Sequence, residues 1–158
     1  RPRVIWLYRE NVLRQAISLI KVKLHRKGRM ATPVHSTEDC PLETLAVEPR
    51  VVVEHARSLA AANEDARQRL AGWELLELTY SQVVGGENGM AERLSPVQAR
   101  RICKFLDVPY KPMAAGLRRV NPYPLSALLG NWPEVAAAVR ETELARSLDE
   151  EAALWPPS

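Results

Sequence analysis

The fold is decided by the first 18 residues, Arg1-Pro-Arg-Val-Ile-Trp-Leu-Tyr-Arg9-Glu-Asn11-Val-Leu-Arg14-Gln-Ala-Ile-Ser18. The apolar run over residues 4–8 predicts a buried strand. Asn11 is a residue type that caps helices, so we expect a helix to begin at Val12. Arg9 stands where the strand should end, a position at which α/β folds commonly hold an anion. This stretch therefore predicts an α/β fold with an anion site between its first strand and first helix.

The composition is that of a globular protein with one core. The chain has 158 residues, of which 46% are hydrophobic and 26% are charged. No apolar run approaches the ~20 residues that a membrane-spanning helix needs, so we expect no membrane partner. Cys40 and Cys103 are far apart and lack metal-ligand spacing. We therefore expect two free thiols, no metal and a reducing, cytoplasmic setting.

Positive charge is concentrated at the start of the chain. Residues 1–29 hold nine Lys and Arg residues and one acid, Glu10, whereas the other residues hold 13 Lys and Arg against 18 Asp and Glu. A basic front on a mildly acidic body favours a local phosphate site over a general nucleic-acid surface. The alternative is a solvated basic helix end.

Helical spacing continues from Val12 to about His25. The residues expected to face the core are Leu13, Ile17, Ile20 and Leu24. A neighbouring polar stripe holds Arg14, Ser18, Lys21 and His25.

Later elements are placed by turn and cap signals. We expect a loop over residues 30–49, a helix from Pro49 to near Gly72 and a strand over residues 73–80. The capping box Ser95-Pro-Val-Gln98 predicts a helix that ends before Pro109. Short helical signals follow at residues 125–129, and a last helix is expected from Asn131 to about Leu148. The aromatic residues expected in the core are Trp73, Tyr80, Phe105 and Trp132. We expect a single α/β domain over residues 1–148, with a short parallel sheet flanked by helices, and a tail at 149–158.

Most catalytic motifs are missing. The sequence has no GxxxxGK[ST], GxGxxG, HExxH or GxSxG motif, and His25, His35 and His55 are scattered. Arg9 and Ser18 remain as candidates, because a guanidinium and a hydroxyl together bind a phosphate monoester well. The alternative is that Arg9 pairs with a carboxylate and Ser18 is an ordinary helix-surface residue.

Residues 4–19 resemble the 3′-phosphate-binding segment of sulfotransferases, especially the bacterial carbohydrate and nodulation-type enzymes. Further segments resemble later parts of that family in the same order: Leu76-Glu-Leu-Thr-Tyr80, Ile102-Cys-Lys-Phe-Leu-Asp-Val108, Arg118-Arg-Val-Asn-Pro-Tyr-Pro-Leu125 and Gly130-Asn131 with Pro133-Glu-Val135. The resemblance implies a partial P-loop-like sulfotransferase fold and 3′-phosphoadenosine-5′-phosphosulfate as co-substrate. It also implies that Arg9 and Ser18 clamp the donor's 3′-phosphate. Their spacing is one residue longer than in the cytosolic sulfotransferases, so Asn11 and Arg14 are alternative donor-binding residues.

The resemblance implies transfer of a sulfuryl group to a hydroxyl or amine of a carbohydrate or small molecule. The family's 5′-phosphosulfate loop is expected before Arg1, which would make the chain a C-terminal part whose catalytic residues are unknown; His35 is a weak candidate base. A non-catalytic interaction or regulatory module on a degenerate form of this fold is the main alternative. Nucleic-acid binding through the basic first helix is a third and is not expected. A sheet lacking its first strand exposes an edge, which could pair with a second copy or another partner.

Overall fold

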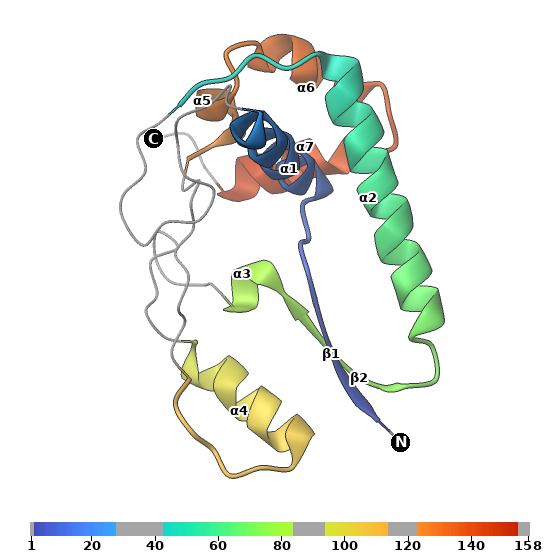
Figure 1. Ribbon diagram of the computed structural model, residues 1–158, viewed down its shortest axis with the longest axis vertical. Coiled ribbons are helices and arrows are strands. Elements are labelled where there is room, and N and C mark those ends of the chain that lie inside the picture. The colour runs from blue at the N-terminus through green and yellow to red at the C-terminus, as the bar shows by residue number, and fades with distance from the viewer. Residues whose placement is uncertain (1, 28–42, 84–93, 114–122, 155–158) are drawn as a thin grey trace. The chain divides into compact units, whose positions relative to one another are not determined.

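A computed structural model describes residues 2–27, 43–83, 94–113 and 123–154. Within these ranges the protein is a mixed α/β structure with seven helices and one two-stranded parallel sheet (Figure 1). The elements are β1 (Arg3–Tyr8), α1 (Val12–Arg26), α2 (Pro49–Arg69), β2 (Glu74–Thr79), α3 (Tyr80–Val83), α4 (Pro96–Leu106), α5 (Leu125–Leu128), α6 (Trp132–Arg140) and α7 (Arg146–Leu154). The described part of the chain thus agrees with the α/β class that the sequence predicts.

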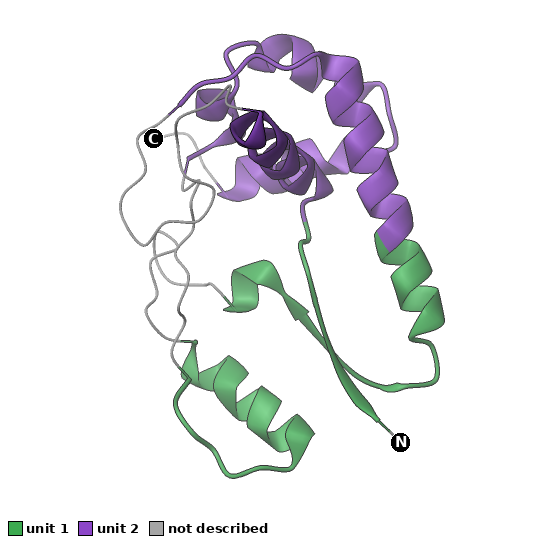
Figure 2. Cartoon of the chain, in the orientation of Figure 1, with its two compact units in different colours: residues 1–10, 35–37, 63–122 green, residues 11–34, 38–62, 123–158 purple. Residues whose placement is uncertain are grey.

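The chain divides into two compact units (Figure 2). We call the first the strand unit; its described elements are β1, α2 from Asn63 onward, β2, α3 and α4. The second, the helical unit, holds α1, α2 up to Ala62, α5, α6 and α7. One boundary between the units falls between Glu10 and Asn11, two residues after the end of β1. The single domain expected over residues 1–148 stays a prediction.

In the strand unit, β1 and β2 pair in parallel, from Arg3 opposite Glu74 to Tyr8 opposite Thr79. This register brings the carboxyl ends of both strands to the same edge of the sheet. The expectation that the first strand is buried is wrong. Ile5 and Leu7 are 38% and 50% exposed, and no residue of β1 is buried. The physical reason is the size of the sheet, because two strands cover much less surface than the larger, doubly covered sheets in which parallel strands are usually found.

The other side of β1 carries two aromatic rings. Trp6 and Tyr8 are half-buried, and their ring centroids lie 4.8 Å apart. The guanidinium of Arg67, from the end of α2, lies over the Trp6 ring at 5.3 Å and pairs with Glu77 of β2 at 3.5 Å. These contacts hold the last turn of α2 against the sheet within the strand unit.

The core of the helical unit follows the predicted periodicity of α1. Leu13, Ile17 and Ile20 are buried and Leu24 is partly buried, as predicted. Their partners include these buried residues of α2, α5 and α6: Val52, Ala56, Leu125, Leu128, Val135 and Val139. Burial of this apolar stripe, at about 25 cal/mol per Å² of apolar area, is the main stabilisation of α1 in the unit.

Several helix starts and stops are confirmed. Helix α2 begins at Pro49. The side chain of Ser95 accepts a hydrogen bond from the Gln98 backbone N at 3.2 Å, which caps α4 as the capping box predicts. Helix α4 ends at Leu106, before Pro109. Gly72 adopts φ +88° between α2 and β2, a conformation that side-chain-bearing residues rarely adopt.

The expectation of one helix from Asn131 to Leu148 is wrong. Two helices, α6 and α7, are separated by a turn over residues 141–145. The hydroxyl of Thr142 donates to the Val139 carbonyl at 2.7 Å and accepts from the Leu144 N–H at 3.1 Å, which redirects the chain. The side chain of Asn131 does not cap α6. It accepts from the Val47 N–H at 3.1 Å and donates to the Val47 carbonyl at 2.8 Å.

The cysteines and the loop expected at residues 30–49 lie only partly within the described ranges. Cys103 is a buried free thiol as expected, whereas Cys40 lies outside the described residues. Most of the expected loop at residues 30–49 also lies outside them, and within the remainder Leu45 forms a parallel bridge with Leu129.

Trp73 is 47% exposed, so its assignment to the core is wrong; it lies in the turn before β2 rather than within the strand. None of the helices in the described ranges has both the length and the apolar character to cross a bilayer.

Candidate functional site

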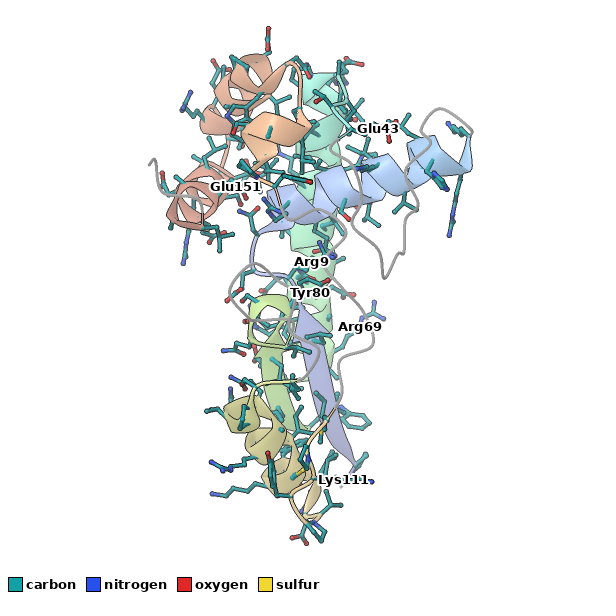
Figure 3. All side chains as sticks on the ribbon, turned by 90° about the vertical axis from the view of Figure 1, so that its left-hand side faces the viewer. Arg9, Glu43, Arg69, Tyr80, Lys111 and Glu151 are labelled. Atoms are coloured by element: carbon teal, nitrogen blue, oxygen red, sulfur yellow. The ribbon has the colours of Figure 1, made fainter. Side chains whose placement is uncertain are left out.

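The strongest candidate site lies at the carboxyl ends of the two parallel strands. Because β1 and β2 end in register, Arg9 and Tyr80 follow them at the same edge of the sheet. The guanidinium carbon of Arg9 lies 4.2 Å from the centroid of the Tyr80 ring (Figure 3). A cation at this distance from an aromatic face is attracted by the ring's quadrupole, which orients the guanidinium.

Among the described residues, the hydrogen-bond donors of Arg9 have no acceptor. Within the described residues, Arg9 makes no hydrogen bond and no ion pair, and the stacking on Tyr80 is its one recorded interaction. A cation over a ring face is held by the ring's quadrupole rather than by a conventional hydrogen bond, so this contact places no N–H of the guanidinium on a conventional acceptor. Arg9 as a whole is half-buried. Such a group can bind a phosphate or sulfate with two parallel hydrogen bonds.

A polar network fixes the chain on either side of this contact. The Ser81 hydroxyl donates to Glu10 Oε2, and it also contacts the Thr79 hydroxyl at 3.0 Å. The Thr79 N–H donates to Gln82 Oε1 at 3.0 Å, and the Gln82 N–H donates to Thr79 Oγ1 at 3.3 Å. These bonds join the residue after Arg9 to the residue after Tyr80. They therefore restrain the stacked pair, and they engage the nearby carboxylate of Glu10.

Asn11 belongs to the helical unit and has a structural role there. Its Oδ1 accepts from the Arg14 N–H at 2.9 Å, which confirms the predicted cap of α1. Its Nδ2 donates to the Ser147 carbonyl at 2.8 Å, and the residue is buried. Both ends of the carboxamide are thus engaged within the protein.

Arg14 is likewise engaged within the helical unit. Its Nε donates to Glu151 Oε2 at 2.9 Å, and its Nη2 donates to Glu151 Oε1 at 2.8 Å and to the Tyr123 carbonyl at 2.6 Å. Glu151 Oε1 also accepts from the Leu125 N–H at 2.9 Å. The sequence reasoning missed Glu151 because its segment was expected to be a tail, and no motif marks it as a partner for a residue of α1.

Ser18 lies on α1, half-buried, in the helical unit. Its hydroxyl has no hydrogen-bond partner within the described parts of the chain. Arg9 belongs to the strand unit, and each unit is described by itself. The clamp that Arg9 and Ser18 are expected to form therefore stays a prediction.

Of the histidines, His55 is engaged by neighbouring groups in the helical unit. His55 contacts Lys23 Nζ through Nε2 at 2.9 Å and the Val51 carbonyl through Nδ1 at 3.1 Å. His35, the weak candidate base, lies outside the described residues, as do Arg118 and Arg119. No group of three or more His, Cys, Asp or Glu side chains placed to hold a metal occurs in the ranges that the structure describes.

Comparisons of this chain with protein-family models, with curated proteins and with solved structures find no match.

Proposed function

We propose that the protein is sulfotransferase-like: that it binds 3′-phosphoadenosine-5′-phosphosulfate and transfers the sulfuryl group to a hydroxyl or amine of a carbohydrate or small molecule. Two lines of support meet in the opening stretch. Residues 4–19 resemble the donor-binding segment of sulfotransferases, and the first candidate residue within them, Arg9, has a guanidinium whose donors meet no acceptor in the described ranges.

The state of Arg9 is the observation that carries the proposal. Ligands of α/β folds bind outside the carboxyl ends of parallel strands, and Arg9 directly follows β1 at that end. A structural arginine normally pairs with a carboxylate, as Arg14 does with Glu151, whereas Arg9 has no such partner among the described residues. An arginine that is oriented by an aromatic ring and lacks a counter-ion suits the recognition of a phosphate.

Ser18 is proposed as the second donor to the 3′-phosphate, because its hydroxyl is unengaged within the described chain. Asn11 and Arg14 suit this role less well, since binding an anion would require them to break the bonds to Ser147 and Glu151. The parallel pairing of β1 with β2, each followed by a helix, is compatible with a P-loop-like sulfotransferase fold.

The proposal is tested by titrating adenosine 3′,5′-bisphosphate into the chain in a calorimeter. Because charged hydrogen bonds contribute about 1.5–3 kcal/mol, Arg9→Ala should weaken binding at least roughly tenfold. Arg9→Lys should also weaken binding, since an ammonium cannot form the two-bond contact. Arg50→Ala is the matched control: it removes one exposed arginine of α2 that pairs with Glu54 on the same helix, and binding should stay unchanged. An Arg9→Ala variant that binds as tightly as the wild type would contradict the proposal.

Binding of the nucleotide alone does not separate an enzyme from a non-catalytic module. That distinction is tested by incubating the chain with ³⁵S-labelled donor and a panel of sugars and amines. Label in an acceptor, lost in Arg9→Ala, supports a transferase. Nucleotide binding without transfer favours the regulatory module.

A further inference from the structure

Gln15 carries an unusual polar atom. Its side-chain oxygen Oε1 is out of contact with solvent and has no hydrogen-bond partner in the described structure. The residue as a whole is only half-buried. A buried acceptor without a donor costs free energy, so native proteins contain few of them, and each one calls for an explanation.

Gln15 lies on α1 one helical turn before Ser18. Residues three apart on a helix are neighbours on its surface, so Gln15 and Ser18 share one side of α1. That side is distinct from the core stripe, where Leu13, Ile17 and Ile20 are buried. Gln15 is therefore not needed to fill the core, and the two neighbouring side chains each carry a polar group without a partner in the described chain.

We infer that Gln15 is a specificity-determining residue for the nucleotide, and that its amide oxygen accepts a hydrogen bond from the ribose 2′-hydroxyl. The inference rests on the proposed function. A 3′-phosphate held at Ser18 has a 2′-hydroxyl on the adjacent ribose carbon, and this hydroxyl is a hydrogen-bond donor. The half-exposed Gln15 side chain can turn about its own bonds to meet this donor, which relieves the unsatisfied oxygen. A site that hydrogen-bonds a ligand hydroxyl selects against the analogue that lacks it.

The test compares adenosine 3′,5′-bisphosphate with its 2′-deoxy analogue by calorimetry. We expect the wild type to bind the ribose form about threefold to tenfold more tightly, the range given by one neutral hydrogen bond. Gln15→Met has nearly the same shape but no acceptor of this kind, so it should bind both nucleotides with similar affinity. Gln68→Met is the matched control, because Gln68 is exposed on α2 and bonds to Glu64; it should keep the wild-type preference.

The thermal midpoint, Tm, of the free protein is a second readout. A structural role for Gln15 would make Gln15→Met lower Tm, whereas a role in ligand binding would not. If Gln15 serves the ligand, Gln15→Met should leave Tm unchanged or raise it, because the unsatisfied oxygen is removed. A lowered Tm with the ribose preference retained would overturn the inference and assign Gln15 to the fold. If the wild type binds both nucleotides with equal affinity, the inference about Gln15 is overturned and the proposed function stands. If the wild type binds neither nucleotide, both the inference and the proposed function are overturned.

Discussion

Arg14 and Glu151, 137 positions apart in the sequence, form a two-bond ion pair inside the helical unit. Their side chains are 13% and 6% exposed, so the pair is largely removed from water. Through the Tyr123 carbonyl and the Leu125 N–H, the same pair also holds the chain that enters α5. One arginine of the first helix thereby joins α1, α5 and α7.

Removal of one partner of this pair should destabilise the protein strongly. Glu151→Ala leaves a desolvated guanidinium without its counter-ion and should lower the free energy of unfolding by about 3 kcal/mol. Urea denaturation measures the change. Glu54→Ala, which breaks the exposed Arg50–Glu54 pair, should cost less than about 1 kcal/mol. Equal, small effects in the two variants would show that Arg14 and Glu151 are not a buried structural pair.

The two contacts of Asn11 should be separable by substitution. Asn11→Ala loses both the cap of α1 and the donor to the Ser147 carbonyl, and we expect a loss of about 2 kcal/mol. Asn11→Ser keeps a capping oxygen but not the long donor, so about half of that loss should remain. Chemical denaturation of both variants tests this order. Identical losses in Ala and Ser would assign the whole effect to the contact with Ser147.

The ring of Tyr80, rather than its hydroxyl, should support Arg9. Tyr80→Phe keeps an aromatic face under the guanidinium, so its affinity for adenosine 3′,5′-bisphosphate should stay within about twofold of the wild type. Tyr80→Leu removes that face and should weaken binding by about threefold to fivefold, because a cation–π contact that is not fully desolvated contributes about 0.5–1 kcal/mol. Calorimetric titration distinguishes the two. A Phe variant as weak as the Leu variant would mean that the hydroxyl, and not the stacking, is needed.

The exposed pair of Arg57 and Glu143 should make a small contribution to stability that is lost at acid pH. The hydrogen bond from Arg57 is the largest cause that holds the pKa of Glu143 below its ordinary value, and the same bond raises the pKa of Arg57. A carboxyl whose folded pKa is lowered stabilises the protein above its unfolded pKa, and this contribution is lost as pH falls through the folded pKa. In Arg57→Gln, the pKa of Glu143 measured by carboxyl-carbon NMR should therefore rise toward the ordinary range. An unchanged titration midpoint would exclude the contact in solution.

The sequence predicted the elements whose signals are local. The spacing of Leu13, Ile17 and Ile20 placed the core face of α1, and Asn11 and Ser95 marked the residues that cap α1 and α4. These signals operate within one or two helical turns, so they can be read without knowledge of the rest of the chain.

The errors concern properties that depend on distant residues. The exposure of Ile5 and Leu7 depends on how many strands and layers surround β1, which an apolar run does not reveal. The break between α6 and α7 is the exception, because it depends on the nearby hydroxyl of Thr142, which competes with the helix for backbone groups. The engagement of Arg14 depends on Glu151, at the far end of the chain. Helical periodicity shows that an arginine lies on the surface of a helix. It does not show whether that arginine binds a carboxylate of the protein or a ligand.

The central claim is that Arg9 binds a nucleotide 3′-phosphate. Its most direct test compares the affinities of the wild-type chain for two nucleotides. Adenosine 3′,5′-bisphosphate and adenosine 5′-monophosphate differ only in that phosphate. The bisphosphate should bind at least roughly tenfold more tightly, because its 3′-phosphate gains one or more charged hydrogen bonds, and this preference should disappear in Arg9→Ala. Equal affinity of the wild type for the two nucleotides would contradict the claim.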